Sequence, residues 1–240
     1  MAFLKIEQIE RIELIDEIIE TIMKQVAEGK IKPGDRIPGE RSLSEMFNVS
    51  RTSIRQALKS LEFLGVLEIR HGATTTLKTS STSLFINPLR FMSILYNIDI
   101  SEFFDARKTI EIALAKKAAQ HASYQDIENM RRCLEIAENS FDNPEDYLYR
   151  EKDFHECIFI ASGNQILTAM INSMNVLLVG SRKESIKTFE NLKVSFDKHY
   201  KIFEAIEKQD VEAAGEAMLD HLEDVERRLH SLSVMTKPAY

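Results

Sequence analysis

The sequence of 240 residues has no long apolar run: stretches such as Ile158–Ala161 and Val176–Val179 are only four residues long. A membrane-spanning helix needs about 20 consecutive apolar residues, so neither stretch can form one. The N-terminal residues also lack a basic segment followed by an apolar one. We therefore expect no signal peptide.

Cysteine is scarce: the chain has only Cys133 and Cys157, and their spacing is not the CxxC of redox or metal-binding motifs. Both fall in helical, partly apolar surroundings, so we expect them to be buried, reduced thiols. Together with the missing signal peptide and membrane span, this predicts a cytoplasmic protein with no membrane partner.

The sequence also lacks common catalytic motifs: it has no GxSxG nucleophile elbow, no Walker loop and no dinucleotide fingerprint. Its composition, with 44% hydrophobic and 29% charged residues, is that of a globular protein. We expect one large domain or two small ones, and no enzymatic activity.

Charge is spread unevenly along the chain. The net charge is −7, yet Lys30 to Lys78 contains nine Lys and Arg against five Asp and Glu, a balance of +4. The remainder therefore carries −11. A basic segment attached to an acidic body is typical of a DNA reader joined to a sensing or dimerising domain.

The N-terminal part predicts three helices followed by a two-stranded wing. The helices are expected at Gln8–Glu28, at Glu40–Phe47 and from Arg51 to Gly65, and the strands at Val66–Arg70 and Thr74–Lys78. Asn48 can end the second helix in the left-handed conformation, and Ser50 can cap the third. This order of elements is that of a winged helix-turn-helix.

Apolar spacing predicts which faces of these helices point inward. The expected inward residues are Leu43, Met46 and Phe47 on the second helix, and Ile54, Leu58, Leu61 and Leu64 on the third. The first turn of the third helix then faces outward, where helix-turn-helix proteins present side chains to base edges.

Several polar residues on this outward surface suit contacts with DNA. Arg51 and Arg55 can bind guanine bidentately, Thr52 and Ser53 suit phosphate or thymine methyl contacts, and Gln56 lies beside them. Arg41 is placed to touch the DNA backbone, and His71 at the wing tip could reach a minor groove. The alternative is that these are solvated residues of an amphipathic helix.

The segment from Ile15 to Leu77 resembles the N-terminal domain of GntR-family bacterial transcription regulators. It matches their pattern from Pro33-Gly34-Asp35-Arg36 through Val49-Ser50-Arg51 to Gly65, with Gly39 and Asn48 as departures. Arg70-His71-Gly72 resembles the wing of the FadR branch. The resemblance implies DNA contacts by Arg41, Arg51, Thr52, Arg55, His71 and Gly72. With the residues chosen from the helix itself, the candidate set is Arg41, Ser50, Arg51, Thr52, Ser53, Arg55, Gln56, His71 and Gly72.

After a polar linker, the rest of the chain has helical periodicity. We divide it into a DNA-binding domain (1–78), a linker (79–87) and an all-helical effector-binding and dimerisation domain (88–235). The predicted helices are Pro88–Tyr96, Ile100–Ser123, Tyr124–Ser140, Pro144–Ala161, Asn164–Ser185, Asn191–Lys208 and Asp210–Leu232. The predicted fold is therefore mainly α, a winged helix-turn-helix followed by an antiparallel bundle of six or seven helices.

Histidines carry the candidate chemistry of this second domain. Glu151 and His155 are four residues apart on one predicted helix and share a face, while His199 and His221 lie in the last two helices. Three imidazoles and a carboxylate could hold Zn²⁺ or another first-row divalent ion. Helical histidines are also common as hydrogen-bonded residues without a metal, so spacing leaves both interpretations open.

Residues 88 to 232 resemble the FCD effector domain that accompanies this DNA-binding domain in the FadR branch. The matching features are Asp105-Ala106-Arg107 with Glu111, Phe154-His155, Ser162-Gly163-Asn164, His199 and His221. The resemblance implies a metal, zinc first and Ni or Mn next, on Glu151, His155, His199 and His221. Glu151 replaces the usual aspartate. The resemblance also implies that Arg107 and Arg182 face the effector, for which a small organic acid is suited.

The sequence thus predicts a homodimeric transcription regulator of the repressor type. Its two heads would bind a pseudo-palindromic operator under the control of the effector. One alternative is the same regulator without metal, binding an acyl ligand. The other is a helical-bundle metalloenzyme, which the single Glu151-x-x-x-His155 pair disfavours because di-metal bundles carry paired Glu-x-x-His motifs.

Overall fold

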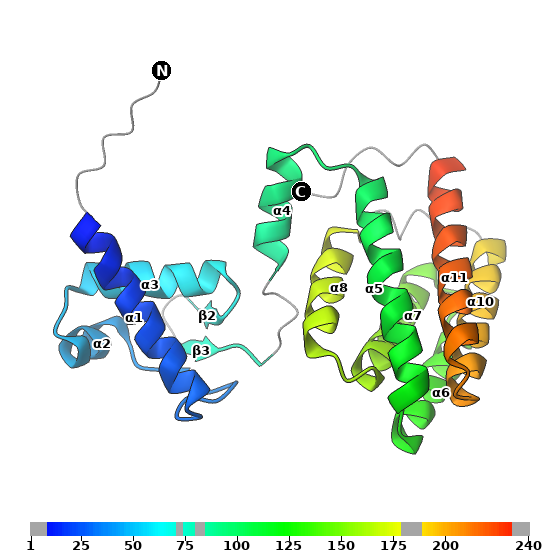
Figure 1. Cartoon of the computed structure of the whole chain (residues 1–240), viewed down its shortest axis with the longest axis horizontal. Coiled ribbons are helices and arrows are strands. Elements are labelled where there is room, and N and C mark those ends of the chain that lie inside the picture. Colours follow the sequence, from blue (N-terminus) through cyan, green and yellow to red (C-terminus); the bar gives the residue numbers. More distant parts are fainter. Residues whose placement is uncertain (1–8, 71–73, 80–84, 179–188, 232–240) are drawn as a thin grey trace. The chain divides into compact units, whose positions relative to one another are not determined.

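A computed structural model of the protein describes residues 9–70, 74–79, 85–178 and 189–231 (Figure 1). The chain divides into two compact units, residues 1–87 and 88–240. No helix within the described residues is both long and apolar enough to cross a bilayer. Three predicted contact residues, His71, Gly72 and Arg182, lie outside the described residues.

The first unit combines helices with one small antiparallel sheet. Its elements are α1 (Ile9–Ala27), β1 (Arg36–Ile37), α2 (Glu40–Phe47), α3 (Arg51–Phe63), β2 (Leu67–Ile69) and β3 (Thr75–Leu77). The strand order is β1-β3-β2, with Ile37 opposite Thr75 and Glu68 opposite Thr76. The two predicted strands of the wing are confirmed as β2 and β3, and β1 adds a third strand that the sequence did not predict. A strand of two residues is too short to show the alternation of apolar and polar residues by which strands are predicted.

Backbone conformation at two positions confirms the predicted turn between α2 and α3. Asn48 adopts φ 53° and ψ 44°, and its N–H is bonded to the carbonyls of Ser44 and Glu45. The Ser50 hydroxyl then accepts a hydrogen bond from the Ser53 N–H, which caps α3. Asparagine tolerates the left-handed region better than most residues, and serine satisfies an unpaired amide at a helix start. The turn therefore fixes the direction in which α3 leaves α2.

The core of the first unit is centred on α3. Ile54, Leu58 and Leu61 are almost fully buried and belong to one cluster with Ile18 and Ile22 of α1. Two predicted core residues are on the surface instead: Met46 is 70% exposed and Leu64 is 43% exposed. Leu64 is exposed because it follows the last residue of α3 and no longer continues its inward face. On α2, Phe47 packs against the core in place of its neighbour Met46.

The second unit consists of helices throughout its described residues, as the sequence predicts. They are α5 (Ile100–His121), α6 (Tyr124–Glu138), α7 (Pro144–Ala161), α8 (Gln165–Leu177), α10 (Phe189–Glu207) and α11 (Val211–Ser231), with α4 (Ile86–Leu95) starting at the boundary between the units. Helix α5 packs against α7, α10 and α11, and α10 also packs against α6 and α11 (Figure 1). The predicted helix Asn164–Ser185 ends earlier as α8, at Leu177.

Local sequence explains where several of these helices begin. Asn143 caps α7 by accepting from the amides of Glu145 and Asp146, and Pro144 occupies the first helical position, where its missing N–H costs nothing. Ser123 and Asp126 form a reciprocal capping box at the start of α6. These caps fix the register of α6 and α7, and so the faces that they turn toward their neighbours.

Candidate functional site

The first turn of α3 presents a polar surface to solvent. Arg51, Thr52, Arg55 and Gln56 are all exposed, while Ile54 and Leu58 on the opposite side are buried. With Arg41 at the start of α2, also exposed, these residues form what we call the basic face. An exposed helix start with two arginines can supply hydrogen-bond donors to phosphates and to guanine.

Arg55 is held by a carboxylate from the preceding helix. Its Nε donates to both oxygens of Glu40, at 2.9 and 3.1 Å, and its Nη2 donates to Oε2 at 2.6 Å. The hydrogen bond from Arg55 lowers the pKa of Glu40 and raises that of the guanidinium. The outer edge of the guanidinium is therefore oriented before any contact with DNA.

Of the other residues predicted to contact DNA, Arg41 is on the surface, whereas Ser50 and Ser53 take part in the cap of α3. Arg41 pairs with Glu45 on the same helix at 3.1 Å, and the Ser50 hydroxyl serves as the helix cap. Ser53 does not reach the surface: its side chain is 4% exposed, and its hydroxyl lies 2.9 Å from that of Ser50. Ser53 therefore completes the cap and does not belong to the basic face.

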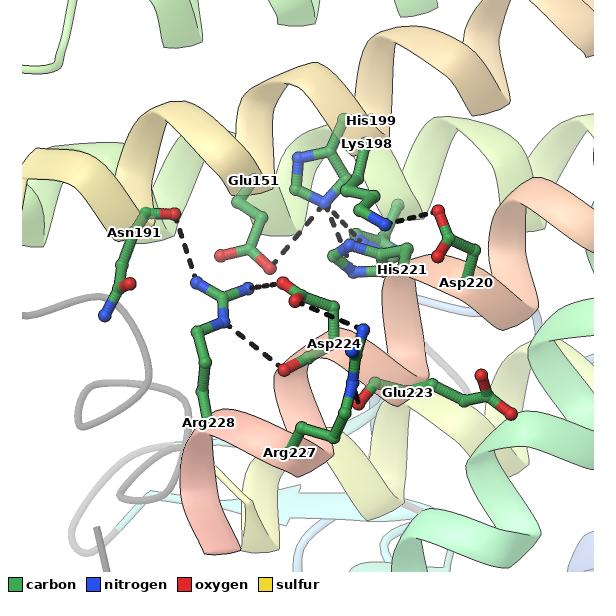
Figure 2. A network of polar contacts seen from close by, with 11 residues as sticks. Glu151, Asn191, Lys198, His199, Asp220, His221, Glu223, Asp224, Arg227 and Arg228 are labelled. Atoms are coloured by element: carbon green, nitrogen blue, oxygen red, sulfur yellow. Dashed lines mark hydrogen bonds and ion pairs between the residues drawn. The ribbon is translucent and has the colours of Figure 1, made fainter. Parts of the chain in front are cut away.

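Glu151, His155, His199 and His221 meet inside the helical unit, and we call them the histidine cluster. Each offers one ligand atom, and these atoms lie within 4.8 Å of one another. His199 Nε2 is 3.3 Å from His221 Nε2 and 3.9 Å from Glu151 Oε1 (Figure 2). It is also 3.2 Å from His155 Nε2. All four side chains are buried, with at most 5% exposed. Residues from α7, α10 and α11 thus converge on one point.

A second carboxylate lies beside Nδ1 of His155, the ring nitrogen that does not face the cluster. Glu111 of α5 places Oε2 3.0 Å from His155 Nδ1, and Arg107 Nε donates to Glu111 Oε1 at 2.7 Å. Burial alone would raise the pKa of Glu111, but the charges and hydrogen bonds of Arg107 and His155 outweigh it and lower the pKa to about 2. An ionised Glu111 favours a proton on His155 Nδ1, which leaves the Nε2 lone pair facing the cluster.

The cluster fits a divalent ion better than it fits a set of hydrogen bonds. An imidazole nitrogen carries either one proton or one lone pair in the ring plane, so His199 Nε2 cannot bond both neighbouring imidazoles properly. For Zn–N bonds of about 2.0–2.1 Å, tetrahedral ligand atoms lie about 3.3 Å apart, close to the observed N···N distances. Burial, with the charges of His199 and His155, lowers the pKa of His221, which favours the neutral form that binds metals.

Two charged groups next to this cluster are held in place by other contacts. Arg228 of α11 pairs with Asp224 at 2.9 Å and donates to the backbone carbonyl of Asn191 on α10 at 3.1 Å (Figure 2). Lys198 of α10 pairs with Asp220 of α11. These contacts tie α10 to α11 on either side of His199 and His221, and so fix the separation of the two imidazoles.

Arg107 is the predicted effector residue that the structure describes. It is 2% exposed, and its Nη1 has no hydrogen-bond partner among the described residues. Its Nε donates to Glu111, which in turn contacts His155, so the guanidinium lies close to the cluster. An open depression of about 540 Å³ lies elsewhere, lined by Lys117, His121 and residues 162–166. None of the candidate ligands lines that depression.

Comparison with known protein families agrees with this arrangement. Residues 14–77 match the bacterial regulatory proteins of the gntR family, and residues 102–224, more than half of the chain, match the FCD domain. The chain belongs to the GntR family of bacterial regulatory proteins. As a GntR-family protein with an FCD domain it is a DNA-binding transcriptional regulator and not an enzyme, which confirms the predicted class.

Individual relatives support the same assignment over nearly the whole length. The chain is 28% identical to the HTH-type transcriptional regulator YcbG of Bacillus subtilis, covering 94% of each chain. It is also 28% identical to the HTH-type transcriptional repressor NanR of Escherichia coli K12, covering 93% of this GntR-family protein and 86% of NanR.

Solved structures confirm the fold. A GntR protein of Streptococcus agalactiae superimposes with a TM-score of 0.67 at 22% identity, over 89% of this chain and 99% of the other. E. coli McbR/YncC superimposes with a TM-score of 0.53 at 17% identity, over 92% and 98% of the two chains. The mainly α architecture, a winged helix-turn-helix followed by helices, is therefore that of GntR regulators.

Two residues of these sites had no role assigned from the sequence. The sequence does not identify Glu40 as a partner of Arg55, because the pairing of an acidic residue on one helix with an arginine on the next leaves no pattern in the sequence. Glu111 was named only as part of a motif, although its spacing of four from Arg107 on one helix is a signal for an ion pair. Its contact with His155 depends on the packing of α5 against α7.

Proposed function

We propose that this GntR-family protein is a homodimeric repressor whose operator binding is controlled by a small carboxylate seated at a divalent metal. In this proposal residues 1–78 bind DNA, residues 88–235 sense the effector, and residues 79–87 link the two. Glu151, His155, His199 and His221 would hold the metal, with zinc the first candidate and Ni or Mn the next. The observation that carries the proposal is the convergence of three buried Nε2 atoms and one carboxylate on a single point.

The chemistry of the cluster supports a metal in this role. A divalent ion supplies a Lewis-acid site on which a carboxylate oxygen can bind. Three neutral imidazoles and one carboxylate leave such an ion with net positive charge, and a carboxylate effector would bind by raising the coordination number above four. Glu111 supports the set by fixing the ring of His155, since partners of this kind commonly raise metal affinity.

Arg107 supports a carboxylate as the effector. A buried guanidinium with an unpaired Nη1 is costly unless a further acceptor is available, and a carboxylate is the acceptor that arginine binds best. Glu111 occupies the Nε side of Arg107 and leaves Nη1 for a ligand. Arg182 remains a second candidate for the same role.

The basic face supports operator recognition by two copies of the protein. Two heads related by a two-fold axis would bind half-sites of a pseudo-palindrome. Helix α4 offers a surface for the pairing, because Phe91, Ile94 and Leu95 are 63%, 55% and 60% exposed. Exposed apolar side chains that follow one another on a helix are typical of protein interfaces. The repressor assignment is supported by similarity to NanR, which is named a transcriptional repressor.

Metal analysis tests this proposal directly. Protein purified without chelator is expected to carry one divalent ion per chain, and the Glu151→Ala/His199→Ala variant to carry almost none. Binding of small organic acids, measured by thermal shift, should require the ion. A metal-free wild-type protein that binds long acyl ligands would contradict the metal proposal, and it would favour the alternative of an acyl-responsive regulator.

A further inference from the structure

The two cysteines lie side by side in the folded protein although 23 residues separate them in the sequence. Cys133 is on α6 and Cys157 is on α7, and their Sγ atoms are 3.5 Å apart. Helices α6 and α7 pack against each other. The pair is therefore held together by two rigid elements and not by a loop.

Neither cysteine is part of the buried core. The sequence predicted buried thiols, but both are half-buried, each beside the apolar stripe of its own helix. On α6 that stripe contains Met130 and Leu134, and on α7 it contains Phe154 and Ile158. The two cysteines thus lie at the edge of the α6–α7 contact, and both are partly exposed to solvent.

The pair is well placed for a covalent bond between the two sulfur atoms. A disulfide has an S–S length of about 2.05 Å, so the sulfurs must approach by about 1.5 Å. Rotation of the two side chains can supply most of this movement, because each thiol is at the end of a single χ1 torsion. Neither thiol belongs to the basic face or is a ligand atom of the histidine cluster.

We propose that Cys133 and Cys157 are a redox modification site that forms a reversible intramolecular disulfide with a hydroperoxide as oxidant. The bond links α6 to α7, the helix that carries Glu151 and His155. This site is independent of the proposed metal and effector, because it depends only on the contact between the two thiols.

The reaction balances with one equivalent of hydroperoxide. One thiolate attacks a peroxide oxygen, the O–O bond breaks, and a sulfenic acid forms together with hydroxide, or alkoxide from an organic peroxide. The second sulfur attacks the sulfenic sulfur and displaces its hydroxyl group as water, which forms the S–S bond. The two sulfurs together lose two electrons and two protons, and the peroxide takes up both.

Intact-mass measurement of the full-length protein tests the proposal. The reduced protein is treated with hydrogen peroxide at low equivalents, and the free thiols are then titrated under denaturing conditions. We expect the loss of two hydrogen masses, a fall from two free thiols to none, and a tryptic peptide in which Cys133 is joined to Cys157. Dithiothreitol should restore both thiols.

The single variants Cys133→Ser and Cys157→Ser are the matched controls. Each variant lacks the second thiol, so the remaining cysteine should gain oxygen atoms instead of losing hydrogen. Its thiol should also be consumed more slowly than the thiols of the wild type. The proposal is overturned if the wild-type protein also gains oxygen atoms, if both of its thiols survive the treatment, or if the bond joins two chains on a non-reducing gel. Peptide mapping of the wild type decides the matter even if a variant folds poorly.

Discussion

Arg55 is the side chain of the basic face whose geometry is most restricted. Three hydrogen bonds from its Nε and Nη2 to Glu40 hold the guanidinium across the gap between α2 and α3. Holding one edge of the fork in this way lowers the conformational entropy that the side chain would lose on binding a base. The free edge can then bind the two acceptors of guanine.

Replacing Arg55 should weaken operator binding and reduce its base specificity. We expect Arg55→Ala to cost about 1–3 kcal/mol of operator binding and to relax the preference at one base pair of each half-site. A binding selection with the variant measures both effects. Lys59→Ala is the matched control, because Lys59 is an exposed basic residue two turns from the start of the same helix. An unchanged base preference in Arg55→Ala would remove this residue from the reading surface.

The partner carboxylate should matter for selectivity more than for affinity. Glu40→Gln keeps the shape of the side chain but removes the charge that competes with phosphates for Arg55. We expect non-specific binding to tighten and the salt dependence to steepen by about one phosphate contact. Anisotropy titrations of operator and random duplex over a range of salt measure this change. An equal loss of affinity for the operator and for the random duplex would mean that Glu40 only supports the fold.

Glu111 should control how tightly the histidine cluster holds a metal. We expect Glu111→Gln to lower metal affinity about 10- to 100-fold, because His155 loses the ionised acceptor at its Nδ1. Competition with a chromogenic chelator measures the affinity, and thermal unfolding checks that the variant is folded. Glu212→Gln is the control, since Glu212 forms an exposed ion pair with Lys116. Unaltered affinity in Glu111→Gln would contradict the positioning role.

The sequence predicted the four residues of the histidine cluster, but not the carboxylates that contact the functional residues. Glu151 and His155 share a helix face by spacing, and His199 and His221 are predicted on the last two helices. Spacing left a site without metal open as well, and the family resemblance favoured a metal on all four. The partners Glu40 and Glu111 lie on a different helix from the residues that they orient. Their contacts depend on the packing of α2 against α3 and of α5 against α7. Periodicity within one helix does not predict which residues of two helices come into contact.

At the scale of elements, helices were easier to predict than strands. The bounds of α2 and α7 agree with the sequence prediction because caps mark them: Asn48 ends α2, and Asn143 with Pro144 begins α7. Strand β1 was missed because a two-residue strand depends on its partner β3 and has no pattern of its own. Met46 was assigned to the core because a helix of eight residues offers too few turns to define its inward face.

Helix α4 should carry part of the contact between two copies of the protein. We expect Leu95→Glu to shift the protein from dimer toward monomer, because a carboxylate would have to be buried in an apolar interface. Light scattering after gel filtration measures the mass. Tyr124→Glu, on an exposed position of α6, should leave the mass unchanged. A stable dimer of Leu95→Glu would place the interface elsewhere.

The whole molecule joins a DNA-binding domain, in which the basic excess is confined to Lys30–Lys78, to an acidic helical domain, and regulation requires that the two be coupled. Coupling requires that the effector bind two arrangements of the chain with different affinity. The histidine cluster and Arg107 lie in the helical unit, whereas the basic face lies in the first unit. Removal of the metal site should therefore change the response to the effector without removing the DNA-binding surface.

Operator binding measured against a titration of small carboxylic acids, with wild-type protein and His221→Ala side by side, tests this coupling most directly. The wild type with zinc should change its operator affinity at least several-fold on binding the acid. His221→Ala and chelated wild type should bind the operator as tightly as before and show no response. A His221→Ala variant that responds like the wild type would contradict control of DNA binding through the histidine cluster.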